Sequence, residues 1–106
     1  MVNRFDVYLV NLDAQLGKDA KNTRPCVVIS PDEMNRHLKN VIVAPLSSTN
    51  AKYPTRVEVR FLNSERTVVL DQIRTVDNVR LVKKIGEIDG AAQKATLDRL
   101  TEMFAE

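Results

Sequence analysis

Short apolar runs separated by polar segments occupy most of the chain. The runs Asp6–Leu12, Pro25–Ser30 and Asn40–Leu46 are rich in β-branched residues and predict buried strands. In Thr55–Leu62 apolar and polar residues alternate, which predicts an antiparallel strand with one face in solvent. The residues of that strand expected to face the core are Val57, Val59 and Phe61.

Two shorter strands are predicted in the second half of the chain. They are Thr67–Leu70 and Val82–Ile88, which follow turns at Asn63–Arg66 and Asp77–Arg80. Polar segments at Asp13–Thr23 and Ser47–Pro54 are expected to be loops. The first of them is longer than most connections, which is typical of a functional loop.

Two helices are predicted. A short one begins at Ser30, because Ser30 can act as N-cap, Pro31 suits the first helical position and Glu33 completes a capping box. It is expected to end near Leu38. From Asp89 the apolar period changes to that of a helix, and the residues expected on its inner face are Ala92, Leu97, Leu100 and Phe104. Roughly five or six short strands with a terminal helix favour a small, strongly bent β-sheet or barrel.

Composition limits the class of protein. The chain has 106 residues, of which 43% are hydrophobic and 28% charged, values typical of one globular domain, so residues 1–106 are expected to form a single domain. The net charge of +2 neither requires nor excludes a nucleic-acid partner. One cysteine and one histidine provide no intramolecular disulfide and no ligand set for structural zinc. With no secretion signal and no apolar run of ~20 residues, we expect a soluble, cytoplasmic, metal-free protein without membrane association.

Three polar positions are candidates for chemistry. Arg24 precedes Pro25 at a loop–strand junction, so an extended backbone can aim its guanidinium at a phosphate; a solvated or carboxylate-paired arginine is the plainer interpretation. The hydroxyls of Ser47 and its neighbours can bind phosphate oxygens, or can simply form a turn. Asp71 ends an apolar run, so burial would raise its pKa and make it a better base, unless it forms a surface pair with Arg74.

Other candidates have simpler interpretations. Lys18 follows a glycine in the long loop and can screen phosphate charge, although a free surface lysine is the commoner case. His37 is expected to be exposed. Cys26 lies in an apolar run and is expected to be an inert core residue.

The order of these residues resembles the MazF/PemK/Kid family of bacterial toxin–antitoxin endoribonucleases, over nearly the whole chain. Asp6–Leu12 (DVYLVNL) is similar to the family's opening strand, and Thr23–Ser30 (TRPCVVIS) to its R-P-x-V-[VL]-[IV]-[ST] segment. Val41–Ser48 (VIVAPLSS) is similar to its V-x-P-[IVL]-[ST]-[ST] strand end. Leu70–Asp77 (LDQIRTVD) is similar to L-D-Q-[IVP]-[RK]-[ST]-[IVL]-D, the most specific of these motifs.

The resemblance implies an SH3-like barrel with a C-terminal helix, and a homodimer. It also implies sequence-specific cleavage of single-stranded RNA without a metal or a cofactor. Messenger RNA is the expected target. A cognate antitoxin is the implied partner, bound in the RNA groove by an acidic tail. The implied catalytic residues are Arg24, Ser47 and Asp71. The implied RNA-binding residues are Lys18, Lys21, Ser48, Thr49, Gln72 and Arg74.

The chain also departs from the family pattern. Phe5 replaces a usual glycine, the loop before Arg24 lacks a second glycine, and Lys18 stands where some members have histidine. Val69 stands where some members have a catalytic arginine. The role of that arginine therefore passes to Arg24, or this branch uses other acid–base groups.

Two other functions compete with RNA cleavage. A toxin of the same fold can poison DNA gyrase, as CcdB-like proteins do, but a protein-binding toxin would not need Arg24, Ser47 and Asp71 together. A non-catalytic SH3-like module that binds nucleic acid is the second alternative. Its weakness is that single-strand binders usually stack bases on aromatic rings, and aromatics make up only 5% of this chain.

Overall fold

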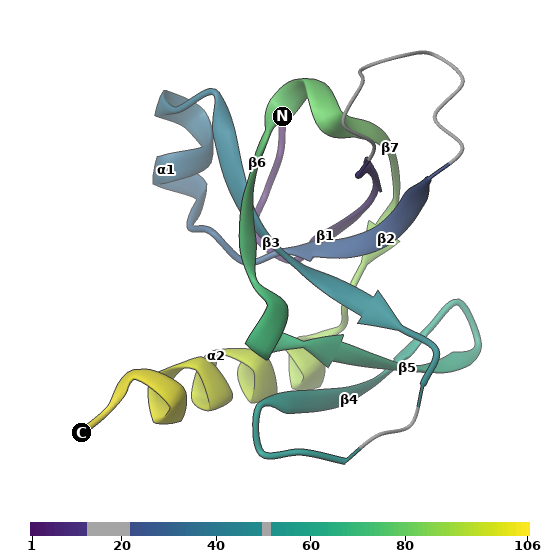
Figure 1. Cartoon of the computed structure of the whole chain (residues 1–106), viewed down its shortest axis with the longest axis vertical. Helices are drawn as coiled ribbons and strands as arrows, with labels where there is room; N and C mark the ends of the chain where they lie inside the picture. The colour runs from purple at the N-terminus through teal and green to yellow at the C-terminus, as the bar shows by residue number, and fades with distance from the viewer. Residues whose placement is uncertain (13–21, 50–51) are drawn as a thin grey trace.

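The computed structural model describes residues 1–12, 22–49 and 52–106 (Figure 1). The elements follow one another in the order β1 (Asp6–Asn11), β2 (Thr23–Val28), α1 (Asp32–His37), β3 (Asn40–Ser47), β4 (Arg56–Phe61), β5 (Ser64–Val69), η1 (Leu70–Gln72), β6 (Arg74–Asp77), η2 (Asn78–Arg80), β7 (Leu81–Glu87) and α2 (Gly90–Phe104). The strands form one antiparallel sheet in the order β4-β5-β3-β2-β1-β7, to which β6 is added by pairing with β3.

β3 is the strand around which the sheet bends. Its first residues, 40–43, pair with β6, whereas its last two, Leu46 and Ser47, pair with β5. The two ends of β3 thus belong to different parts of a strongly curled sheet (Figure 1). The predicted class, mainly β with a bent antiparallel sheet and two helices, is confirmed.

The apolar side chains fill two clusters, one on each side of the sheet. Along β2, Cys26 and Val28 point into one cluster and Val27 into the other, because successive side chains of a strand face opposite ways. Both faces of this strand are therefore covered, and its sequence is a continuous apolar run instead of an alternation. Burial raises the pKa of the Cys26 thiol to about 11, consistent with an inert core residue.

Helix α2 covers the cluster that contains Val27 and packs along β4 (Figure 1). Asp89 is its N-cap and accepts a hydrogen bond from the Ala92 N–H at 2.8 Å, so the predicted start of the helix is confirmed. Leu97 and Leu100 pack against the core as expected. Phe104 does not: it is 71% exposed, because the last turn of α2 runs beyond the sheet (Figure 1).

The predicted cap of the short helix α1 is wrong. Pro31 is the N-cap residue, and no side chain caps this helix. The Ser30 hydroxyl is buried instead, where it donates to Asn35 Oδ1 at 2.5 Å and accepts from the Ile42 N–H at 3.0 Å. Ser30 therefore joins α1 to β3, a long-range role that local spacing does not reveal.

Several predicted boundaries also need correction. β2 begins at Thr23 and ends at Val28, two residues earlier than expected at each end. The turn after β4 consists of Leu62 and Asn63, both with positive φ, so β5 starts at Ser64 inside the predicted turn. β6 was not predicted at all, because its pattern (RTVD) has a single buried residue, Val76.

Gly86 in β7 is a position where a side chain is expected to be costly. Its φ is +151°, and a Cβ would lie 3.0 Å from the Phe61 ring. Gly86→Ala should therefore lower the free energy of unfolding by about 2–3 kcal/mol, measured by urea denaturation. Gly90→Ala is the matched control, since nothing lies within 4 Å of its Cβ and alanine suits the first turn of α2. Equal stabilities of the two variants would contradict this account.

Candidate active site

Two prolines determine where the site opens. The β2–β3 ladder ends at the pair Cys26–Pro45, and the preceding residue of β2 is Pro25. Because proline has no N–H to donate, the two strands stop pairing here and β3 continues to β5. Continuing the register beyond the last pair places Arg24 opposite Ser47, so both side chains lie where the strands separate.

The hydroxyl segment that ends β3 is held from two sides. The Ser47 hydroxyl accepts a hydrogen bond from the Thr49 N–H at 3.1 Å, which closes a small turn. Thr67 on β5, itself buried, donates to the Thr49 carbonyl oxygen at 3.1 Å. Ser48 and Thr49 are exposed, and the hydroxyl hydrogen of Ser47 meets no acceptor among the described residues. The segment is thus both a turn and a set of available donors.

These residues surround an open cavity of about 390 Å³. It brings together the candidates Arg24, Ser47, Ser48, Thr49 and Gln72. The other residues that line it are Pro25, Pro45, Leu46, Arg56, Arg66 and Val69. An adjoining cavity shares Arg24, Pro45 and Gln72 and adds Leu12, Cys26 and Arg74. We call the two cavities together the arginine groove.

Asp71 is linked to this groove by its hydrogen bond with Arg56. It lies in η1, between the fully buried Leu70 and Gln72, where the chain passes from β5 to β6. Its Oδ1 accepts from the Thr55 hydroxyl at 3.0 Å and from Arg56 Nε at 3.3 Å. Asp71 does not itself line either cavity, so of the three candidate catalytic residues only Arg24 and Ser47 line the groove.

The environment of Asp71 differs from the expected one. Its side chain is 37% exposed, not buried, and its partner is Arg56, not Arg74. The hydrogen bond from Arg56, with a smaller contribution from Thr55, holds the pKa of the Asp71 carboxyl below its ordinary value of 3.8. Of the two interpretations of Asp71, burial with a raised pKa is therefore wrong and a surface ion pair is found, with Arg56 in place of the expected Arg74.

The lowered pKa has a measurable consequence. Since the folded state favours the carboxylate, Asp71 adds stability above its ordinary pKa and loses it as pH falls through the lower folded value. The difference in unfolding free energy between the wild type and Asp71→Asn should be constant from about pH 5 to 8, at less than about 1 kcal/mol. It should shrink only below about pH 4, measured by urea denaturation across pH. A difference that changes near neutrality would contradict the assignment.

Two arginines of the groove were not singled out from the sequence. Arg56 lies on the polar side of the alternating strand, where it looked like an ordinary exposed residue. Arg66 fell within the predicted turn, although it lies inside β5 and its Nε is buried without a hydrogen-bond partner among the described residues. The alternation pattern identified the face of Arg56, but nothing local showed that this face meets the ends of β2 and β3.

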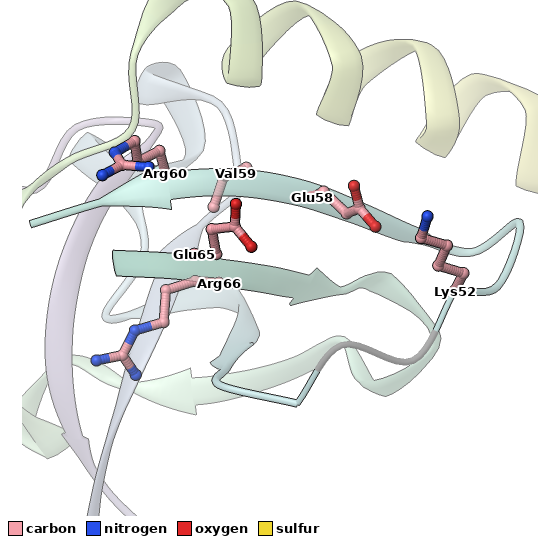
Figure 2. A pocket seen from close by; sticks show the side chains of 6 residues that line it. All are labelled: Lys52, Glu58, Val59, Arg60, Glu65 and Arg66. Atoms are coloured by element: carbon pink, nitrogen blue, oxygen red, sulfur yellow. The ribbon is translucent and has the colours of Figure 1, made fainter. Parts of the chain in front are cut away.

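A second cavity lies across the β4–β5 hairpin and is less suited to an anion. Figure 2 shows that the carboxylates of Glu58 and Glu65 stand among its basic side chains, and that Arg66 points away from Glu65. A phosphate there would meet negative as well as positive charge. The described lining of the arginine groove, in contrast, contains arginines and no carboxylate.

Some predictions lie outside the described residues or concern absences. Lys18 and Lys21 fall among residues that the structure does not describe. No group of three or more His, Cys, Asp or Glu side chains that could hold a metal ion occurs in residues 1–12, 22–49 and 52–106. No described helix is long and apolar enough to cross a membrane.

Comparison with known proteins agrees with the resemblance in the sequence. A family model described as PemK-like, MazF-like toxin of type II toxin-antitoxin system matches residues 3–104. The protein named Endoribonuclease MazF from Staphylococcus epidermidis is 37% identical over 91 residues, covering 80% of this chain and 76% of that protein.

Solved structures with the same fold are more distant in sequence. An endoribonuclease in complex with its cognate antitoxin, from a mycobacterial species, has a TM-score of 0.82 at 23% identity, covering 96% of this chain and 93% of its own. The MazE–MazF structure (Form-II) from Deinococcus radiodurans has a TM-score of 0.79 at 19% identity, covering 98% and 95%. With the family model spanning nearly the whole sequence, the chain belongs to the PemK-like, MazF-like toxins of type II toxin–antitoxin systems.

Proposed function

We propose that this toxin is a sequence-specific, metal-independent endoribonuclease that cleaves single-stranded RNA, with messenger RNA its main target, and so stops translation and growth. The observation that supports this most is the arginine groove, in which Arg24 and the Ser47 hydroxyl lie together at the ends of two strands. The name of the Staphylococcus epidermidis relative describes the same activity. Membership of this toxin family favours cleavage over the gyrase-poison and non-catalytic interpretations.

RNA supplies its own nucleophile, the 2′-hydroxyl. Its attack on the adjacent phosphorus forms the P–O2′ bond and breaks the P–O5′ bond, giving a 2′,3′-cyclic phosphate and a free 5′-hydroxyl. In the transition state negative charge increases on the non-bridging phosphate oxygens. Preorganised charged hydrogen-bond donors stabilise this charge, each by about 3–4 kcal/mol. In this proposal Arg24 supplies a bidentate guanidinium and Ser47 a hydroxyl donor.

Asp71 is the acceptor for the 2′-hydroxyl proton. Because its pKa is lowered, it is fully ionised at neutral pH but is a weak base, so its main contribution is to orient the hydroxyl for attack. The proton leaves the 2′-oxygen through Asp71, and water protonates the departing 5′-oxygen. A guanidinium stays charged at physiological pH and is therefore a poor donor of that proton.

Contacts with RNA beyond the scissile phosphate follow the groove. Ser48, Thr49 and Gln72 offer hydrogen-bond donors beside Ser47 and Arg24, and Arg74 extends the positive charge into the adjoining cavity. Lys18 and Lys21, in the segment that precedes β2 in the sequence, remain predicted RNA-binding residues. Phosphate contacts of this kind position a strand, whereas base preference requires contacts to base edges.

The partners follow from the same surface. The groove attracts polyanions, so an acidic tail of the cognate antitoxin is proposed to occupy it and prevent RNA from binding. The toxin is proposed to act in the cytoplasm as a homodimer, in which residues 1–106 of each chain form a single domain. Structures of relatives with their antitoxins support such a partner.

The direct test is incubation of the purified, antitoxin-free dimer with a long single-stranded RNA in EDTA, followed by mapping of the new 5′-ends. Discrete cuts within a short recurring motif are expected, with cyclic phosphate ends. If a folded dimer gives no cuts, the proposal fails, and a gyrase supercoiling assay becomes the next measurement.

A further inference from the structure

Position 69 carries no charge, although it lies in the lining of the groove. Val69 lines the same cavity as Arg24 and Ser47, but its side chain can only make apolar contacts. The L-D-Q segment begins at the next residue. If the growing charge on the phosphate needs a second guanidinium beside Arg24, the arginines that line the same cavity are Arg66 on β5 and Arg56 on β4.

Arg56 is the direct neighbour of Val69 across the β4–β5 ladder. Opposite residues of an antiparallel pair project from the same face with their Cβ atoms about 5 Å apart. The side chain of Arg56 is longer than this separation, and Arg56 also lines the cavity. An arginine at position 56 can therefore deliver its charge to the space that an arginine at position 69 would reach.

The contacts of Arg56 fix its position without using its terminal nitrogens. Its guanidinium carbon lies 4.6 Å from the centre of the Tyr53 ring, and its Nε donates to Asp71 Oδ1 at 3.3 Å. Neither Nη has a hydrogen-bond partner among the described residues. The side chain is 21% exposed and borders both the groove and the neighbouring cavity that Tyr53 lines, with both Nη groups unused among the described residues.

We propose that Arg56 is a second catalytic arginine of this toxin, contacting the scissile phosphate in place of a guanidinium from position 69. This inference rests on the proposed endoribonuclease activity. While Nε orients Asp71 beside the 2′-hydroxyl, the Nη groups donate to a non-bridging oxygen, whose charge increases as P–O2′ forms and P–O5′ breaks. Arg56 transfers no proton. Arg56 thus contacts both Asp71, which accepts the 2′-proton, and the phosphate oxygen on which the attack creates charge.

The test compares four variants of the dimer in single-turnover cleavage of one mapped RNA. Arg56→Ala should cleave about 10²-fold more slowly than the wild type, whereas Arg56→Lys, which keeps the charge, should retain a larger share of the rate. Arg60→Ala is the control, since Arg60 is exposed on the same strand and lies outside the groove; its rate should be unchanged. The combined change Arg56→Ala/Val69→Arg should regain at least tenfold over Arg56→Ala, because it returns the charge from the neighbouring position.

A second readout separates catalysis from folding and binding. The affinity of Arg56→Ala for the same RNA with a 2′-deoxy scissile nucleotide should be within about threefold of the wild-type affinity. The reason is that the hydrogen bonds from Arg56 to the phosphate strengthen only as charge develops in the transition state. Thermal melting of each variant shows whether it folds; if the combined variant does not, Arg56→Lys against Arg56→Ala decides. Cleavage by Arg56→Ala within threefold of the wild type, or a loss of affinity as large as the loss of rate, overturns the proposal.

The failure of this inference looks different from the failure of the proposed function. If Arg56→Ala cleaves normally while Arg24→Ala does not, the ribonuclease assignment stands and only the role of Arg56 is wrong. If the wild type itself gives no cuts, the ribonuclease assignment fails and the role of Arg56 fails with it.

Discussion

Replacing Arg24 by alanine is expected to reduce RNA cleavage by about 10³-fold while leaving the fold intact. Arg24 lies at the mouth of the groove opposite Ser47, and its side chain is exposed. Its backbone holds the β1–β2 ladder through the pair with Val10, which alanine can preserve. The substitution removes stabilisation of the transition state, to which a preorganised charged donor contributes most. Single-turnover cleavage of a mapped RNA, with urea denaturation alongside, measures both parts of this expectation.

The matched control for Arg24 is Arg36→Ala. Arg36 is an exposed arginine on α1, outside the arginine groove, so its removal changes net charge equally but takes nothing from the site. Its cleavage rate should match that of the wild type. A folded Arg24→Ala protein with near wild-type turnover would remove the basis of the mechanism, because Arg24 is the arginine that the extended β2–β3 register places opposite Ser47.

The fold was largely predictable because most of its elements are encoded locally. β1, β3, β4 and β7 each have their own apolar run or alternation, and Asp89 caps α2 through contacts within one turn. β6 was missed for the opposite reason: it becomes a strand by pairing with β3, and only Val76 is buried. Ser30 was misassigned for a similar reason, since its hydroxyl serves Ile42 on another strand.

Residues of the site that belong to a motif within one segment could be predicted from the sequence. Residues that join the site only because strands meet there could not. Arg24, Ser47 and Gln72 were found from their motifs, and the structure brings them together. Arg56 was not found, because its relation to Val69 and Asp71 exists only through the β4–β5 register and the turn at η1. The same contact lowers the pKa of Asp71, and the sequence alone left open whether burial would raise this pKa or a surface ion pair would lower it.

A single 2′-deoxy nucleotide at the scissile position is expected to abolish cleavage at that position. In the proposed mechanism the 2′-oxygen is the nucleophile, so removing it leaves nothing for Asp71 to orient and no P–O2′ bond to form. Binding should change little, because the phosphates that Arg24 and its neighbours contact are still present. The measurement is cleavage of a synthetic RNA that carries the deoxy substitution at the mapped site, with affinity determined on the same strand.

The control is the same strand with the deoxy substitution one nucleotide away, which should be cut at the usual site. An all-deoxy strand should also stay intact, since a groove that only neutralises phosphate charge cannot replace the missing hydroxyl. Cutting at the deoxy position would require water or a protein side chain as nucleophile. Ser47, which lines the groove together with Arg24, would then be the first residue to test, and Asp71 would lose its assigned partner.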